Sequence, residues 1–229
     1  MGATGGIGSA IAKALAHPEN HLMLLGRKKD ALQKLARTLD RNTKVSFFVA
    51  DLARPESLRR SLTQIKKSTQ KVDWLIYAAG TIQKEPMKTV SYKDLADSFA
   101  VNLNGLVLAV SSLRGILSSK GGVIAISSTS GLWGNGLFPI YSSSKAALNM
   151  FMQSEAKSDT GSLRYITLCP GPTNTAMRER VAHDSSKHQS PERIADTVAE
   201  IMSGKRASKN GDVFVIRNNA VTQVDSHIS

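Results

Sequence analysis

The chain has 229 residues, which is enough for one sizeable α/β domain and leaves little for a second. Its hydrophobic share of 41% and its charged share of 21% are those of a globular protein and exclude a disordered chain. The single cysteine, Cys169, excludes an intrachain disulfide and favours a reducing compartment.

The formal net charge of +12 suits an acidic partner such as nucleic acid or a membrane surface. However, the basic residues are spread over many segments, and aromatic residues make up only 5% of the chain, too few for a base-stacking surface. The longest apolar run, 103–117, is interrupted by Asn104 and Arg114. We therefore expect a cytoplasmic protein with no nucleic-acid partner and no membrane partner.

Apolar residues alternate between helical spacing and strand-like runs along the whole chain. In chain order they mark a helix at 7–15, a strand at 21–25, a helix at 32–39, a strand at 45–49, a helix at 58–65, a strand at 74–77, a helix at 95–106, a strand at 123–126, a helix from about 141, a strand at 165–169, a helix at 194–201 and a strand at 213–216. This alternation predicts a doubly wound, Rossmann-like α/β fold with a parallel sheet between two helical layers (αβα). We expect residues 1–229 to form a single domain.

A glycine-rich stretch, Gly2-Ala3-Thr4-Gly5-Gly6-Ile7-Gly8, leads directly into the first helix. Glycines there allow a tight turn and a close approach to a pyrophosphate, whose charge is favourable at a helix N-terminus. Taken alone, the stretch is weak evidence for a nucleotide site, because glycine-rich turns are common.

Three side chains form a stronger pattern. Ser128 precedes Tyr141 by thirteen residues, and Lys145 follows Tyr141 by one helical turn, which puts the phenol and the ammonium on one helix face. A tyrosine that exchanges protons near neutral pH needs a pKa roughly three units below its usual value of about 10, and a nearby cation acts in that direction. An isolated Tyr and Lys at this spacing would more simply be surface residues at a helix start.

Together these features resemble the short-chain dehydrogenase/reductase family over essentially the whole chain. The glycine turn departs from the family pattern at Met1, which replaces a threonine, and the segment Tyr77-Ala78-Ala79-Gly80 departs at its first two positions. The matching segments are Gly2–Gly8, Asp51-Leu52, Ala79-Gly80, Asn102, Ser128, Tyr141 with Lys145, and Pro170-Gly171 with Thr175.

The resemblance implies hydride transfer between NADP(H) and a small carbonyl or alcohol substrate. It implies that Tyr141 exchanges the proton, that Ser128 polarises the carbonyl, that Lys145 holds the nicotinamide ribose and lowers the pKa of Tyr141, and that Asn102 supports a water-mediated proton relay. The residues expected to bind the cofactor are Gly2, Thr4, Gly6, Ile7, Gly8, Arg27, Asp51, Leu52, Ala79, Gly80, Asn102, Tyr141, Lys145, Pro170, Gly171, Thr173 and Thr175.

The choice of cofactor is expected to depend on the end of the second strand of the fold. NAD enzymes of this fold tend to carry a carboxylate there, whereas this chain has Gly26, then Arg27 and Lys28. A guanidinium can hold a 2′-phosphate, so we favour NADP(H) over NAD(H). Alternatively, these are ordinary charges that open the next helix.

The remaining candidates give weaker indications. We expect Leu132, Trp133, Phe138 and Met177 to line a partly apolar substrate pocket. The stretch Arg178–Gln189 is interpreted as a surface loop or a lid. Arg178 and Arg180 suit an acidic substrate, although loop arginines are usually solvated. His183 and His188 have no third ligand at a suitable spacing, so we expect no metal. We interpret Cys169 as a buried apolar residue and expect a homodimer or homotetramer.

Two alternatives remain open: a catalytically weak or inactive cofactor-binding sensor or scaffold, and a basic protein associated with nucleic acid. In the family, a strand of about five apolar residues precedes the glycine turn at the centre of the sheet. Here only Met1 precedes Gly2. The resemblance therefore implies that the first strand is missing from this chain and that the natural protein begins several residues upstream, a real truncation being the alternative.

Overall fold

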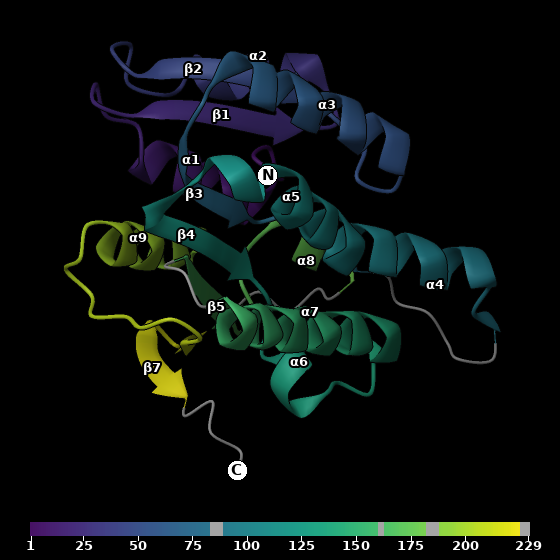
Figure 1. Cartoon of the computed structure of the whole chain (residues 1–229). Helices are drawn as coiled ribbons and strands as arrows, with labels where there is room; N and C mark the ends of the chain where they lie inside the picture. Colours follow the sequence, from purple (N-terminus) through teal and green to yellow (C-terminus); the bar gives the residue numbers. More distant parts are fainter. Residues whose placement is uncertain (83–88, 160–162, 182–187, 225–229) are drawn as a thin grey trace.

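The structure, a computed structural model, describes residues 1–82, 89–159, 163–181 and 188–224. Helices and strands alternate along the chain (Figure 1). The elements in order are α1 (Gly6–Ala14), β1 (His21–Gly26), α2 (Lys29–Ala36), β2 (Lys44–Val49), α3 (Pro55–Ser68), β3 (Val72–Tyr77), α4 (Tyr92–Phe99), α5 (Gly105–Leu113), β4 (Leu117–Ile126), α6 (Ser130–Trp133), α7 (Pro139–Ser158), β5 (Arg164–Pro170), α8 (Ala176–Glu179), α9 (Pro191–Met202), β6 (Val213–Arg217) and β7 (Ala220–Val224).

The strands form a layer that helices cover on both faces. Successive residues of β4 point to opposite faces, so Val123 and Ala125 pack toward α3, α5 and α7, whereas Ile124 and Ile126 pack toward α1 and α9. Both sets are buried, which is why this strand is apolar without alternation. The predicted Rossmann-like α/β fold with three αβα layers is confirmed.

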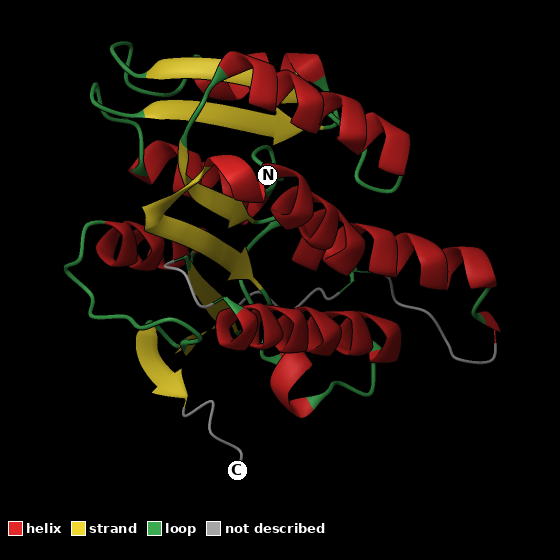
Figure 2. Ribbon diagram, viewed as in Figure 1, coloured by secondary structure: helices red, strands yellow, loops and turns green. Residues whose placement is uncertain are grey.

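The strand layer is not one continuous sheet. β1 pairs with β2 in a two-stranded parallel sheet, and a second sheet has the order β3-β4-β5-β6-β7, parallel except for β7. Figure 2 shows the two groups of strands separated. A cavity of about 420 Å³ lies between β1 and β3, lined by Ile11, Met23 and Trp74 among others. We call this cavity, between β1 and β3, the slot.

The first residues of the chain close one end of the slot. The amine of Met1 donates to Ile76 O at 2.6 Å, and Met1 O accepts from Ala78 N at 3.0 Å, which is the pattern of a parallel ladder. On the other side, the N–H groups of Gly2 and Ala3 donate to Leu25 O at 2.9 and 3.0 Å. No strand of the described residues lies between β1 and β3.

Strand alternation shows which backbone groups face the slot. Leu25 and Ile76 bond to the first residues of the chain, so the residues two positions earlier, Met23 and Trp74, also direct their N–H and C=O groups into the slot. Burial lowers the pKa of the Met1 amine to about 5.

Residues Tyr92–Ile116 form a helical run of 25 residues that could cross a membrane by length and composition alone. In the structure its second half packs into the protein core, where Leu106, Val110 and Leu113 are buried. The predicted single helix at 95–106 is in fact α4 and α5 joined by a π-helical turn, Ala100–Asn104.

The sequence patterns missed three short elements. β7 follows Asn218 and Asn219, both with positive φ, and pairs antiparallel with β6 as a hairpin. The four-residue helices α6 and α8 are too short to show helical periodicity.

The apolar residues of β2 do not all face the core. Phe47 and Val49 stay exposed while Phe48 is buried, because β2 is an edge strand.

Candidate active site

The glycine turn before α1 is held against two other segments of the site. Added Cβ atoms would lie 2.6 Å from the backbone of Ala79 at Gly2, 2.6 Å from the side chain of Thr175 at Gly6, and 2.2 Å from Gly2 O at Gly8. Only glycine fits at these positions, and Gly2 also has a φ of +77°. The packing therefore brings the turn beside the segments that follow β3 and β5.

The N-terminus of α1 is open to a ligand. Its N-cap residue, Gly5, has no side chain, and Thr4, Gly5 and Gly6 are exposed. The first amides of a helix attract an anion such as a phosphate when no side chain caps them. The predicted nucleotide-binding residues of this turn are therefore close together and accessible, except that Gly8 is buried inside the turn.

Ser128 and Tyr141 come together across the end of β4. Ser128 follows β4 and accepts a hydrogen bond from Ser130 N at 3.1 Å. Tyr141 lies in the first turn of α7, which begins with Pro139 at a position where its missing N–H is harmless. The side chain of Ser128 lies close enough to the phenol of Tyr141 to lower its pKa.

Burial raises the pKa of Tyr141 above its usual value, while the hydrogen bond from Ser128 and the charge of Arg178 act in the opposite direction. The net shift is upward, because the loss of hydration around the phenol outweighs the nearby charges. The expected lowering of this pKa by Lys145 stays a prediction.

Lys145 lies one turn after Tyr141 on α7 and is buried. Its ammonium donates to Ile126 O at 2.9 Å and lies 5.9 Å from the centroid of the Tyr141 ring. Burial lowers the pKa of Lys145 to about 8. Gly80 lies beside it, since an added Cβ there would be 3.5 Å from Lys145 Nζ and 3.4 Å from Asn102 Oδ1.

Asn102 lies in the π-helical turn and is fully buried. Its Oδ1 accepts from Thr81 N at 2.8 Å, and its Nδ2 donates to Thr81 O at 3.0 Å and to Ser144 Oγ at 2.8 Å. Asn102 therefore ties the segment after β3 to α7. Isolated π-helical turns often occur at functional sites, because they redirect one side chain. The predicted role of Asn102 in a proton relay stays a prediction.

The residues expected at the adenosine end lie across the slot, on β1 and β2. Gly26 ends β1, and Arg27 after it is exposed and has no ion pair among the described residues. One carboxylate oxygen of Asp51, Oδ1, already accepts a hydrogen bond from Ala53 N at 3.1 Å. The side chain of Leu52 is buried in the core, so only its backbone can face a ligand.

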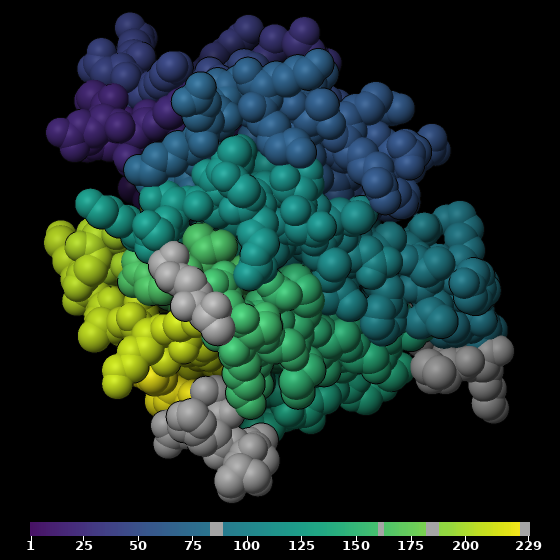
Figure 3. Space-filling view, viewed as in Figure 1, coloured from purple at the N-terminus to yellow at the C-terminus, as the bar shows by residue number. Residues whose placement is uncertain are grey.

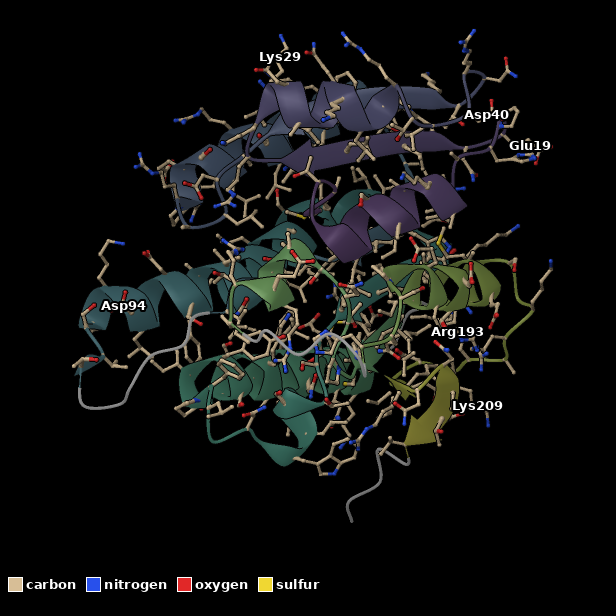
Figure 4. The ribbon with its side chains drawn as sticks, turned by 180° about the vertical axis from the view of Figure 1, so that it is seen from behind. Glu19, Lys29, Asp40, Asp94, Arg193 and Lys209 are labelled. Carbon is tan, nitrogen blue, oxygen red and sulfur yellow. The ribbon has the colours of Figure 1, made fainter. Side chains whose placement is uncertain are left out.

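Charged side chains lie at both ends of this β1–β2 region. Figure 4 shows Lys29, at the start of α2, at one end and Glu19 and Asp40 at the other. Lys29 follows the carboxyl end of β1, whereas Glu19 and Asp40 precede β1 and β2. Three consecutive basic residues, Arg27, Lys28 and Lys29, thus follow the carboxyl end of β1, while Arg41 and Lys44 lie at the start of β2.

The segment after β5 is fixed by hydrogen bonds. Gly171 N donates to Ile216 O at 2.8 Å, and Thr173 Oγ1 donates to Gly171 O at 2.9 Å. Gln189, which the sequence patterns did not single out, is buried and donates through Nε2 to Ile216 O at 2.9 Å. Thr175 begins α8 by accepting the N–H of Arg178. Pro170, Gly171, Thr173 and Thr175 thus form one ordered segment.

The residues expected to line a substrate pocket do not share one environment. Phe138 is buried at the start of α7, Trp133 is 65% exposed, and Leu132 packs against the cluster that contains Cys169.

Cys169 is buried and its pKa is raised to about 12, as expected of a residue that packs rather than reacts. Among the described residues, no group of three or more His, Cys, Asp or Glu side chains could hold a metal ion, and His183 lies outside them.

Comparison with known proteins gives one consistent family. A sequence profile of the short chain dehydrogenase family matches residues 1–186. Carbonyl reductase family member 4 of Danio rerio is 29% identical over 193 residues, covering 83% of this chain and 81% of its own length. An uncharacterized oxidoreductase of Mycobacterium tuberculosis is 31% identical over 181 residues, covering 77% of this chain and 69% of its own.

A solved structure agrees with these sequence relatives. The short chain dehydrogenase of Shigella flexneri 2a, complexed with NADP, has a TM-score of 0.85 and 26% identity, and the match covers 93% of each chain. The chain belongs to the short chain dehydrogenase family of oxidoreductases.

Proposed function

We propose that this protein transfers a hydride between NADP(H) and the carbonyl or alcohol group of a small molecule, with Tyr141 as general acid and base. The observation that carries the proposal is that the side chain of Ser128 acts on the phenol of Tyr141, while the buried ammonium of Lys145 lies 5.9 Å from the ring of Tyr141. Ser128 follows β4, and Tyr141 and Lys145 lie in the first turns of α7, so the three side chains come together at the carboxyl end of a parallel strand.

The residues present fit the cofactor. The open N-terminus of α1 suits its pyrophosphate, and Lys145 Nζ, which donates to Ile126 O, keeps further N–H groups for ribose hydroxyls. When bound, NADPH would supply the hydride, while the protein supplies position and electrostatics.

The roles of the side chains follow from their contacts. Ser128 and Tyr141 can both donate to one carbonyl oxygen, which withdraws electron density from the carbon and prepares it for attack. Tyr141 then passes its proton to that oxygen as the alcohol forms. Lys145 stabilises the phenolate that remains, since a cation favours the charged form of a neighbouring acid. Asn102 keeps the segment after β3 in place beside them.

We propose NADP(H) rather than NAD(H) because of Arg27. This exposed guanidinium follows Gly26, where an enzyme selective for NAD would place a carboxylate. The Shigella flexneri relative was solved with NADP, which supports the same choice.

A substrate screen tests the proposed function. Purified protein is mixed with NADPH and a panel of aldehydes and ketones, the loss of absorbance at the nicotinamide band is followed, and the alcohol product is identified by mass spectrometry. Formation of the alcohol supports the proposal. Tight binding of NADPH without turnover on any carbonyl in a broad panel would favour the sensor or scaffold alternative instead.

A further inference from the structure

Arg178 occupies a fixed place at the edge of the candidate active site. It belongs to α8, whose first residues are set by Thr175: Arg178 N donates to Thr175 O at 2.8 Å and to Thr175 Oγ1 at 3.3 Å. Thr175 in turn packs against Gly6 of the glycine turn. The backbone of Arg178 is therefore held between the glycine turn and the segment after β5.

The side chain of Arg178 extends to the start of α7, the helix that carries Tyr141. Its guanidinium carbon lies 5.9 Å from the centroid of the Phe138 ring, and Phe138 is buried three residues before Tyr141. The guanidinium also acts on the phenol, because its positive charge works to lower the pKa of Tyr141. The guanidinium therefore lies beside Phe138 and near enough to Tyr141 for its charge to act on the phenol.

The guanidinium lacks the partner that such a group needs. Its Nε is buried and has no hydrogen-bond partner, and Arg178 has no ion pair among the described residues. A buried N–H of a cation is costly to leave unpaired, and charge-assisted bonds to a carboxylate or phosphate are the strong way to pair it. Of the other basic groups nearby, Lys145 bonds to Ile126 O and is proposed to hold the ribose, and exposed Arg180 bonds to Ala176 O at 3.3 Å.

We propose that Arg178 binds an anionic group of the substrate, so that the substrate is a carbonyl or alcohol compound carrying a carboxylate or a phosphate. The planar fork of the guanidinium suits both groups. The anion fixes one end of the molecule, and the carbonyl oxygen is placed against Ser128 and Tyr141. This inference rests on the proposed function and adds the class of substrate to it.

Matched substrate pairs test the proposal. Short 2-oxo, 3-oxo and 4-oxo acids are compared with their neutral amides, with NADPH, in the wild type, Arg178→Ala and Arg178→Lys. We expect the wild type to reduce at least one acid with a kcat/KM tenfold or more above that of its amide. Arg178→Ala should remove that preference, and Arg178→Lys should keep part of it. The control, Arg180→Ala, changes a solvated arginine two residues away and should keep the full preference.

Binding measurements provide a readout that does not depend on turnover. Butanoate, butanamide and inorganic phosphate are titrated by calorimetry onto the protein saturated with NADP⁺. Butanoate or phosphate should bind at least tenfold more tightly than butanamide, and Arg178→Ala should abolish the difference. Whichever anion binds better identifies the source of the charge. Thermal unfolding of each variant shows that it is folded.

Three results would overturn the proposal. Equal turnover of acids and amides by the wild type would show a neutral substrate, although the proposed function would stand. A loss of NADPH affinity in Arg178→Ala would assign the guanidinium to the cofactor phosphates instead. Anion binding that Arg178→Ala leaves intact would place the anion elsewhere. No turnover of any carbonyl, acidic or neutral, would contradict the proposed function itself.

Discussion

The two groups of strands differ in continuity and in charge. The β3–β7 sheet is continuous, and Ser128 follows directly from one of its central strands, whereas β1 and β2 form a separate pair across the slot. Residues 1–71 carry fourteen lysines and arginines against five aspartates and glutamates, a net charge of +9, and residues 72–229 carry sixteen against thirteen, a net charge of +3. In the space-filling view, the purple to blue segments cover the top of the molecule (Figure 3).

This difference separates two tasks that the proposed reaction combines. The hydroxyls that would act on the substrate are held by a packed, continuous sheet. The β1–β2 pair, whose following residue Arg27 would hold the adenosine phosphate, is connected to that sheet by Met1, Gly2 and Ala3 and by packing on the helices. We therefore expect changes in one region to leave the property that depends on the other intact.

The largest expected effect comes from Tyr141→Phe. This variant should lower kcat at least a hundredfold and leave the Kd of NADPH nearly unchanged, because only the phenolic proton is lost and general acid catalysis is worth about 10² to 10⁴ in rate. Steady-state kinetics and fluorescence titration measure the two quantities. Tyr92→Phe, at a tyrosine that is 85% exposed, is the control and should behave as the wild type. Turnover of Tyr141→Phe at the wild-type rate would contradict its assignment.

A strand added in the slot should join the β1–β2 pair and the β3–β7 sheet into one continuous sheet. Five apolar β-branched residues fused before Met1 should extend the ladder that Met1 starts between β1 and β3, pairing backbone groups of Met23 and Trp74. Each new hydrogen bond contributes about 1 kcal/mol, and 1 kcal/mol raises the Tm of a chain of this size by roughly 2–4 °C, so a rise on the order of 10 °C is expected.

The matched control for that fusion carries five glycine and serine residues before Met1. It has the same length but no apolar side chains to bury, and glycine loses the most conformational freedom when ordered. Its Tm should stay close to that of the unextended chain. Equal Tm values for the two fusions in a calorimetric scan would show that the slot does not accept a strand.

The pH dependence of the free energy of unfolding tests the region of the continuous sheet, where Lys145 is buried. The pKa of Lys145 is about 8 in the folded protein and near 10.5 when unfolded, so between these values the unfolded chain holds a proton that the folded chain has released. The free energy of unfolding contributed by Lys145 therefore rises with pH from about 8 to 10.5. Lys145→Met should remove this rise, which amounts to about 3 kcal/mol.

Urea unfolding at a series of pH values measures this effect. The control, Lys157→Met, changes an exposed lysine on the same helix and should keep the pH dependence of the wild type. An unchanged slope between pH 8 and 10.5 in Lys145→Met would show that Lys145 is not deprotonated on folding.

The smallest expected effect concerns the binding of NADPH at Arg27, which follows β1. Arg27→Ala should weaken NADPH binding roughly ten- to hundredfold, the equivalent of one charge-assisted contact of about 1.5–3 kcal/mol, and leave the Kd of NADH nearly unchanged. Arg41→Ala, at an exposed arginine before β2, is the control and should affect neither cofactor. Equal losses for NADPH and NADH would show that Arg27 does not meet the 2′-phosphate.

The sequence predicts the parts of this molecule whose geometry is local. The spacing of Tyr141 and Lys145 within one helix determines that they share a face, and the apolar run at 123–126 predicts a buried strand. The contact between Ser128 and Tyr141 is not local, and it was predictable only through the resemblance to a family.

Other features depend on contacts between distant segments and left no such signal. The fourfold engagement of Asn102 with Thr81, Ser98 and Ser144 depends on a π-helical turn that interrupts an otherwise regular pattern. The direction of Arg178 depends on how α8 packs on the glycine turn. For β7 a signal existed, since Asn218-Asn219 is a composition typical of a tight hairpin turn.

The separation of β1 from β3 also has a consequence for local unfolding. Opening the β1–β2 pair breaks the bonds of Gly2 and Ala3 to Leu25 O but none of the ladder between β4 and β5. The amide protons of β1 and β2 should therefore exchange with solvent in a common opening event of lower free energy than the one that exposes β4 and β5. The molecule can then lose and regain the edge that we propose to hold the cofactor as a unit, while the strand that leads into Ser128 stays protected.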